Sequence, residues 1–210
     1  MKTLLFQGDS ITDCGRITSG GAGYPKDLWG PGYAGMIATQ LMGDQPGKWE
    51  VINRGISGNR IVDLYARWRI DALNFRPDII SMLIGVNDTG HEICNHNGVE
   101  VPRYDMIYRM IMDWTLEANP ETKFVLMEPF VFPMGNVNDE WIKDVNLRRD
   151  VVRKIAEDYK QIFVPLQNVF DAALNEAPQD YWIADGIHPT PAGHRLIQKE
   201  WMKAAADLIK

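Results

Sequence analysis

The sequence predicts an α/β fold, a three-layer α/β/α sandwich around a five-stranded parallel sheet. Two observations carry this prediction. Short apolar runs alternate along the 210-residue chain with longer segments whose apolar residues recur about every four positions. One of the runs, Asp78–Ile84, is almost continuously apolar, which is typical of a strand in a parallel sheet that helices cover on both faces.

Five segments are predicted to be strands. The first lies close to the N-terminus and ends at Gly8, where a glycine allows a tight turn. Helical segments separate the strands, which indicates βαβ units and favours a flavodoxin-like arrangement in one domain that covers residues 1–210. The five strands are expected at Thr3–Gln7, Trp49–Ile52, Asp78–Ile84, Lys123–Met127 and Gln161–Val164.

Four segments are predicted to be helices. The first has Tyr33, Ile37 and Leu41 on one face. The last has clear start signals, because Thr190 can cap it and Pro191 suits its first position. The other two helices are expected at Arg103–Glu117 and Asp144–Tyr159, and a glycine-rich loop beside the functional site is expected at Gly15–Gly35.

The composition excludes some classes of function. A formal net charge of −6 argues against a nucleic-acid surface, which needs a basic face. No stretch approaches the roughly 20 apolar residues that a membrane helix needs. The apolar run at the N-terminus is too short for a signal peptide, and two cysteines, Cys14 and Cys94, do not make a disulfide framework. We therefore expect a cytoplasmic protein that binds neither nucleic acid nor membrane.

The first motif that could take part in catalysis is Gly8-Asp9-Ser10, directly after the first predicted strand. In open parallel sheets, ligands bind beyond the carboxyl ends of the strands, so a serine at this turn is a candidate nucleophile. Asp and Ser are also common in capped turns, and the motif lacks the Gly-x-Ser-x-Gly pattern of the α/β-hydrolases. Taken alone, this motif leaves both interpretations open.

The second motif, Asp185-Gly186-Ile187-His188-Pro189, can supply what a serine nucleophile needs. A serine hydroxyl requires a base within hydrogen-bond reach, and that base requires an orienting partner. A carboxylate three residues before a histidine can orient the imidazole within one short loop, and Pro189 keeps His188 out of helical geometry. By contrast, His194 falls inside the last predicted helix, where we expect a surface or packing residue.

Two further motifs follow the second and third predicted strands. They contain Gly58, in Ile56–Asn59, and Asn87, in Gly85–Asp88. Acyl transfer builds negative charge on a carbonyl oxygen, and preorganised N–H donors stabilise that charge. A glycine amide and an asparagine side chain are suitable donors, although each motif on its own also suits an ordinary turn at the end of a strand.

Together, the motifs occur in the order Gly-Asp-Ser, Gly, Gly-x-Asn-Asp, Asp-x-x-His, which resembles the SGNH hydrolases, the GDSL esterase/lipase family. The resemblance covers residues 3 to about 208. It implies that Ser10 is the nucleophile and that Asp185 and His188 complete a catalytic triad. It also implies an oxyanion hole formed by Ser10, Gly58 and Asn87, and it implies no cofactor and no metal ion.

Longer segments are similar to the bacterial branch of this family that includes acetylxylan esterases. The family motifs also imply that Asp9 and Asp88 are structural and hold the loops. The closer resemblance implies an acetylated oligosaccharide or another small ester as substrate, and it is compatible with a homo-oligomer. The segments that carry it are Gly8–Arg16, Asn53–Asn59, Ala66–Trp68 and Ile84–Asp88.

Other functions remain to be weighed at this point. A thioesterase or lysophospholipase of the same family would use the same residues, and a non-catalytic carbohydrate-binding relative would have no reason to keep all of them. His91 and His96 are five residues apart, so one helix face would not present both to a metal ion. Trp182 lies near His188 and is a candidate for stacking on a sugar ring, although core packing is the usual role of a tryptophan.

Overall fold

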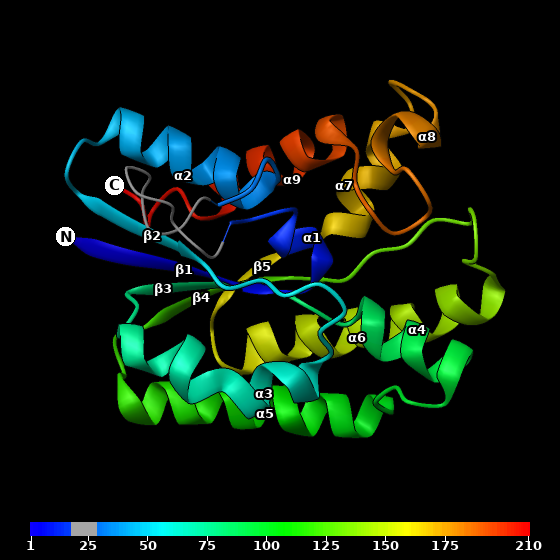
Figure 1. Cartoon of the computed structure of the whole chain (residues 1–210), viewed down its shortest axis with the longest axis horizontal. Helices are drawn as coiled ribbons and strands as arrows, with labels where there is room; N and C mark the ends of the chain where they lie inside the picture. The colour runs from blue at the N-terminus through cyan, green and yellow to red at the C-terminus, as the bar shows by residue number, and fades with distance from the viewer. Residues whose placement is uncertain (18–28) are drawn as a thin grey trace.

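The computed structural model describes residues 1–17 and 29–210, and it has the predicted three-layer architecture (Figure 1). All neighbouring strands of the sheet are parallel, and they lie in the order β2-β1-β3-β4-β5. Helices α2, α7, α8 and α9 cover one face, and α3, α4, α5 and α6 cover the other. The strands are β1 (Lys2–Gly8), β2 (Trp49–Asn53), β3 (Ile79–Leu83), β4 (Lys123–Met127) and β5 (Ile162–Val164).

The helices differ widely in length, from one turn to five. The shortest, α1 (Ser10–Asp13), follows β1 directly. The others are α2 (Tyr33–Asp44), α3 (Ile61–Asp71), α4 (Val86–Asn95), α5 (Val101–Ala118), α6 (Asp139–Asp158), α7 (Leu166–Ala173), α8 (Gln179–Trp182) and α9 (Pro191–Ala204), with a 3₁₀ turn η1 (Leu73–Phe75) after α3.

The core consists of two apolar layers, one on each face of the sheet. Successive side chains of a strand point to opposite faces, so Leu4 and Phe6 pack with α2 and α9, whereas Leu5 packs with α3 and α5. Each layer also buries a tryptophan with a satisfied indole N–H. Trp201 donates to Ser81 Oγ over 2.9 Å, and Trp68 of the opposite layer donates to Thr115 Oγ1 over 2.9 Å.

The strand order makes the carboxyl ends of β1 and β3 a topological switch point of the sheet. From β1 the chain passes to β2 on one side, and it then crosses back to β3 on the other side of β1. Loops that leave neighbouring strands in opposite directions create the position where open α/β sheets bind ligands. Because Gly8 pairs with Leu83 in the register, the segments after β1 and β3 begin at the same level of this edge.

The structure confirms several predicted boundaries and corrects others. β4 spans the predicted residues, and α9 begins at Pro191 with Thr190 Oγ1 accepting from the Gly193 amide. Helices α5 and α6 begin earlier than expected, at Val101 and Asp139, because Pro102 and the Asn138 cap favour earlier starts.

The expectation of a loop over Gly15–Gly35 was wrong at its end, where Tyr33–Gly35 form the first turn of α2. Residues 18–28 of that stretch lie outside the described residues. Along residues 1–17 and 29–210, no helix combines the length and apolar character needed to cross a membrane.

Candidate active site

Ser10 lies at the first position of α1, immediately after β1. The turn requires Gly8, because a Cβ there would lie 2.4 Å from the Leu83 carbonyl oxygen and 2.2 Å from Thr12 Oγ1. Asp9 caps α1, and its Oδ1 accepts from the Ile11 amide over 3.0 Å. This cap fixes the direction in which the chain leaves the sheet and therefore fixes the position of Ser10.

Three of the predicted site residues form one continuous relay. Ser10 Oγ lies 2.9 Å from His188 Nε2, and His188 Nδ1 lies 2.7 Å from Asp185 Oδ2. The carboxylate can only accept, so it selects the tautomer with hydrogen on Nδ1 and leaves Nε2 free to accept from the serine hydroxyl. The side chains of His188 and Asp185 are 46% and 52% exposed, so this relay lies in an open site.

The Asp185 carboxylate is held in its charged form. Its other oxygen, Oδ1, accepts from the backbone amides of Ile187 and His188. Partial burial raises the pKa of Asp185, but the hydrogen bonds from the His188 amide and ring and from the Ile187 amide outweigh it, so the pKa lies below its usual value. A charged Asp185 can stabilise a positive charge on His188.

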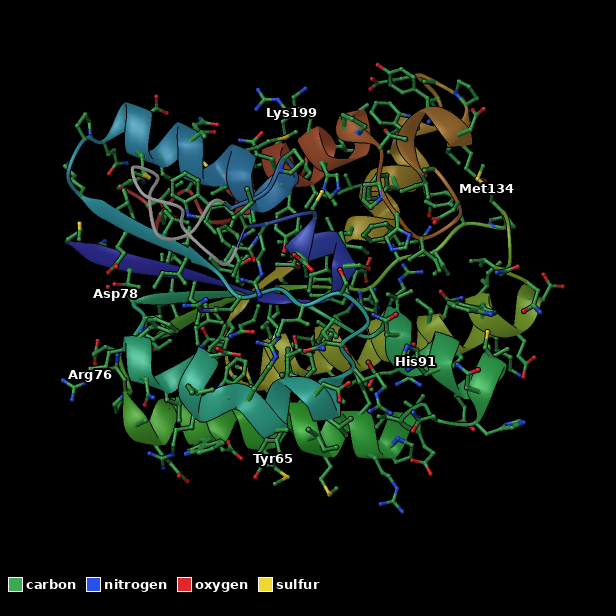
Figure 2. The ribbon with its side chains drawn as sticks, viewed as in Figure 1. Tyr65, Arg76, Asp78, His91, Met134 and Lys199 are labelled. Atoms are coloured by element: carbon green, nitrogen blue, oxygen red, sulfur yellow. The ribbon has the colours of Figure 1, made fainter. Side chains whose placement is uncertain are left out.

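The loop that carries Asp185 and His188 is closed by its own backbone. Ile183 pairs with Pro189 in an isolated antiparallel bridge, and the Ala184 amide donates to the His188 carbonyl. The connection after β4 supports this loop, since the Phe132 amide donates to the Gly186 carbonyl over 2.8 Å. Figure 2 shows the neighbouring Met134 at the same end of the molecule.

Gly58 lies in the loop between β2 and α3, where its φ of 82° suits glycine. Two contacts hold this loop against neighbouring elements. Asp13 Oδ2, on α1, accepts from both the amide and the hydroxyl of Ser57, and the buried Asp88 carboxylate accepts from the Ile61 amide with both oxygens. The loop is therefore tied to the helix of Ser10 and to the helix of Asn87.

Asn87 follows β3 near the start of α4, and its side chain is oriented by the same loop. Its Nδ2 donates to the Asn59 carbonyl oxygen over 3.1 Å. A side-chain amide carries two N–H groups, so this contact orients the amide and leaves the second N–H available. Asn59 is anchored in turn, because its Oδ1 accepts from Arg67 Nε over 2.8 Å.

Two buried carboxyls flank this edge of the sheet. Burial raises the pKa of Asp9 to about 7, although the Ile11 amide and His188 favour its charged form. Burial also raises the pKa of Asp88 to about 7, against the opposing effects of Arg148 and the Ile61 amide. Their side chains accept from the backbone amides of Ile11 in α1 and Ile61 at the start of α3, which agrees with a structural role for both.

Comparison with known proteins agrees with this geometry. Residues 6–196 match the model of the GDSL-like lipase/acylhydrolase family. The chain belongs to this family. It is 34% identical over 208 residues to an acetylxylan esterase of Geobacillus stearothermophilus, a match that covers 96% of this chain and 93% of the relative. The chain is therefore a carboxylic ester hydrolase.

Solved structures of this family are similar along the whole chain. A structure described as a GDSL-like lipase from Parabacteroides merdae is 40% identical, with a TM-score of 0.92, and the match covers 100% of this chain and 96% of the other. The acetylxylan esterase Axe2 of Geobacillus stearothermophilus is 32% identical, with a TM-score of 0.83, and the match covers 97% of this chain and 93% of Axe2.

The Trp182 indole of this GDSL hydrolase has a structural function. Its Nε1 donates to the Ala173 and Ala177 carbonyls, and its ring packs partly against the core and edge-to-face with Tyr181. Any contact of Trp182 with a sugar therefore has to use the exposed part of its ring, since the N–H is already bonded.

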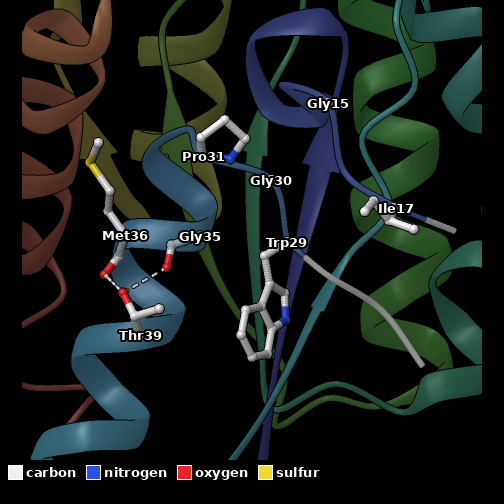
Figure 3. Close-up of a pocket in the computed structure, with 8 residues that line it drawn as sticks. All are labelled: Gly15, Ile17, Trp29, Gly30, Pro31, Gly35, Met36 and Thr39. Carbon is white, nitrogen blue, oxygen red and sulfur yellow. Dashed lines mark hydrogen bonds between the residues drawn. The ribbon is translucent and has the colours of Figure 1, made fainter. Parts of the chain in front are cut away.

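The described part of the hydrolase holds no group of three or more histidine, cysteine, aspartate or glutamate residues suited to a metal ion. His91 lies within α4, and His96 caps the end of that helix (His91 is labelled in Figure 2). An apolar cavity of about 510 Å³ lies beside the start of α2, and Figure 3 draws the residues that line it. No triad residue lines it; the lining residues are Gly15, Ile17, Trp29, Gly30, Pro31, Gly35, Met36 and Thr39.

The sequence motifs did not reveal the residues that hold the site together. Asp13, Asn59 and Arg67 act through hydrogen bonds that join separate elements. Asp13 and Asn59 lie inside the segments that resemble the acetylxylan esterase branch, and Arg67 belongs to Ala66–Trp68 of the same set. The extended resemblance was therefore the available signal, although it did not indicate what each residue contacts.

Proposed function

We propose that this GDSL hydrolase is a serine esterase that removes acetyl groups from xylo-oligosaccharides or related acetylated carbohydrates. The observation that carries the proposal is the relay from Ser10 through His188 to Asp185, with separations of 2.9 and 2.7 Å. Both distances lie in the range at which a base activates a nucleophile and a third group orients the base.

The proposed reaction proceeds in two steps. His188 Nε2 takes the Ser10 proton while Oγ attacks the ester carbonyl, and Asp185 stabilises the resulting imidazolium. His188 then gives this proton to the departing alcohol oxygen as the carbonyl–oxygen bond breaks, which leaves an acyl group on Ser10. A water molecule, activated by the same histidine, hydrolyses the acyl-enzyme and regenerates Ser10. No metal ion or cofactor is needed for these steps.

The oxyanion in this mechanism is bound by the amides of Ser10 and Gly58 and by the second N–H of Asn87. Asp9 Oδ1 takes the Ile11 amide as its partner, so the cap does not use the amide of the nucleophile itself. The hydrogen bond from Asn87 to the Asn59 carbonyl supports this assignment, because it fixes the side-chain amide before substrate binds.

Two observations support a short acyl group on a carbohydrate. The first is the similarity to an acetylxylan esterase along nearly the whole chain. The second is the open relay, whose acid and base are about half exposed, as suits an ester on the surface of a bulky sugar chain. We propose Trp182 as a contact for the sugar through its ring face, and a homo-oligomer remains part of the proposal.

Ester hydrolysis by the Ser10→Ala variant tests the mechanism. We expect no measurable hydrolysis of p-nitrophenyl acetate while the circular dichroism spectrum and melting temperature stay those of the wild type. Retained activity would exclude Ser10 as the nucleophile.

A substrate series tests specificity. We expect acetyl esters to react faster than octanoyl esters, and acetylated xylo-oligosaccharides faster than acetylated monosaccharides. Preference for octanoyl esters or thioesters would favour a lysophospholipase or thioesterase, and tight glycan binding without any hydrolysis would favour a binding protein.

A further inference from the structure

His194 is a buried histidine that the proposed mechanism does not use. It is 6% exposed and lies in α9, the helix that begins three residues after His188. Its ring lies parallel to that of Tyr33 on α2, with an angle of 18° and 6.3 Å between ring centroids. The side chain therefore fills a junction between two helices beside the active site.

Hydrogen bonds at this junction select one tautomer of His194. The backbone amide of Tyr33 donates to Nδ1 over 3.2 Å, so Nδ1 carries no hydrogen. In the neutral ring the hydrogen then resides on Nε2, which lies 3.4 Å from Cys14 Sγ. Because Nε2 carries the hydrogen, His194 donates to the sulfur and cannot act as a base toward it.

Cys14 connects this contact with the helix that carries the proposed nucleophile. It caps the end of α1 in a left-handed conformation, with φ of 38°, and its amide donates to the Ser10 carbonyl over 2.9 Å. The junction is tightly packed, since a Cβ on Gly32 would lie 2.9 Å from Cys14 Sγ and 3.1 Å from His194 Cε1. Movement of His194 would therefore be transmitted to the single turn that carries Ser10.

We propose that His194 is a positioning residue. Its neutral Nε2–H tautomer links α9 to the end of α1 and so keeps Ser10 Oγ at hydrogen-bond distance from His188 Nε2. This inference rests on the proposed function of Ser10 and His188. The contact between His194 and Cys14 is a second connection between the elements that carry Ser10 and His188. α9 is anchored to the His188 loop through Thr190, and α1 begins with Ser10.

The surroundings favour the neutral ring. The titratable groups around it are Cys14 at the end of α1, Tyr33 on α2 and His188 in the loop before α9. Burial, with a smaller effect of the charge on His188, lowers the pKa of His194 to about 4. A proton on Nδ1 would also face the Tyr33 N–H group. His194 thus stays uncharged while His188 becomes positively charged during the reaction.

Nitrogen NMR of the full chain labelled with ¹⁵N-histidine tests the tautomer without reference to activity. The chain has four histidines, and the His194→Gln variant assigns the signal. We expect an Nε2–H tautomer whose shifts stay constant between about pH 5 and pH 9. A signal from the Nδ1–H tautomer, or a titration near the usual histidine pKa of about 6.5, would overturn the proposal.

Steady-state kinetics then tests the positioning role. In His194→Asn, the shorter amide reaches the Nδ1 position and keeps a partner for Tyr33, but the contact with Cys14 is lost. We expect its kcat to fall about five- to tenfold, the effect of one ordinary hydrogen bond, while KM stays within about twofold. Cys14→Ala should show the same loss, and Cys14→Ser, which keeps an acceptor, should recover most of the rate.

The double variant Cys14→Ala/His194→Asn separates a shared contact from two independent effects. We expect its kcat to be no lower than that of either single variant, because both changes remove the same link. Additive losses, or unchanged kcat in all variants despite lower melting temperatures, would leave His194 with packing alone and would contradict the proposal. The exposed His96→Asn is the matched control, with wild-type kinetics expected.

The two measurements keep the failure of this proposal distinct from failure of the proposed function. If the wild-type protein hydrolyses no ester, the assignment of Ser10 fails, and with it the positioning role. If the wild type is active and the Nε2–H tautomer is present but the variants keep full kcat, only the positioning role fails.

Discussion

Strands β1 and β4 are each followed directly by a buried carboxyl at the same edge of the sheet, yet only the carboxyl after β1 adjoins the proposed nucleophile. Asp9, which is 1% exposed, caps the helix that starts with Ser10. Glu128, which is fully buried, accepts from the Gln167 amide and faces Arg149 at 3.3 Å and Arg153 at 3.7 Å. Burial raises the pKa of both carboxyls.

Their surroundings explain the difference. β1 lies where the chain turns to opposite sides of the sheet, so the space beyond it is open to the loops of Gly58, Asn87 and His188. At the end of β4, α6 and α7 close over Glu128 with two arginines and a glutamine. A buried carboxyl with a raised pKa is therefore a weak indicator of a site, and its place in the strand order is a stronger one.

The largest effect on activity is expected beside the carboxyl end of β1, for the Asp185→Asn variant. An amide in place of the carboxylate favours the wrong tautomer of His188 and leaves its positive charge without a partner. We expect kcat for p-nitrophenyl acetate to fall by up to about 10⁴-fold, with the fold unchanged by circular dichroism. A loss of kcat of less than about tenfold would mean that Asp185 contributes little to catalysis.

The second effect concerns the pH dependence of stability near Asp9. Because the pKa of Asp9 in the folded protein is about 7, above its ordinary value of 3.8, the folded state binds more protons than the unfolded state between these values. The stability contribution of Asp9 is thus complete below about pH 4 and is lost as the pH rises through 7.

The Asp9→Asn variant has no titrating group at this position and does not lose this stability as the pH rises. Relative to the wild type, its free energy of unfolding should rise between pH 4 and pH 7 by as much as about 4 kcal/mol. Urea unfolding of both proteins across this range measures the difference. A constant or shrinking difference would show that Asp9 is charged in the folded protein at pH 7.

Removal of the Asn87 amide is expected to have the third-largest effect. Asn87→Ala deletes the proposed oxyanion donor, and kcat should fall by about 10²–10³, or about 2.7–4 kcal/mol of transition-state stabilisation, with KM little changed. Arg67→Met, which releases Asn59 and so loosens Asn87, should give a smaller fall in kcat. An unchanged kcat in Asn87→Ala would remove this residue from the oxyanion hole.

The smallest effect is expected at the end of β4, where a change should affect stability and leave kcat unchanged. Glu128→Gln keeps an oxygen for the Gln167 amide but leaves two arginines without their buried counter-charge, so stability should fall by about 1–3 kcal/mol. Thermal unfolding measures this loss, and kcat of the folded enzyme should remain that of the wild type. If kcat fell as well, the two strand ends would not be functionally separate.

The sequence was informative where local chemistry decides the structure. The apolar run Lys123–Met127 and the Thr190 and Pro191 start signals identified β4 and α9. It missed α3, although Ile61, Leu64 and Trp68 recur there at helical spacing, and it missed α4, whose buried face is largely not apolar. In α4 the buried residues include Asp88, Thr89 and Gly90, and a Cβ on Gly90 would lie 2.4 Å from the Trp141 ring.

The same reasoning applies to the site. The order of the motifs placed Ser10, Asp185 and His188 at one sheet edge, and the structure brings all three together. The contact of Asn59 with Asn87 and that of His194 with Cys14 depend on atoms brought close only by folding, so spacing in the sequence carried no sign of them.

Covalent labelling of Ser10 by a fluorophosphonate ester tests the central claim most directly. Cleavage after Lys2 and Arg16 releases the peptide Thr3–Arg16, in which Ser10 is the only serine. The account predicts one adduct per chain, located on Ser10 by mass spectrometry, with activity lost in proportion to labelling and no adduct in Ser10→Ala. Stoichiometric labelling of another residue, or full esterase activity in a chain labelled at Ser10, would contradict it.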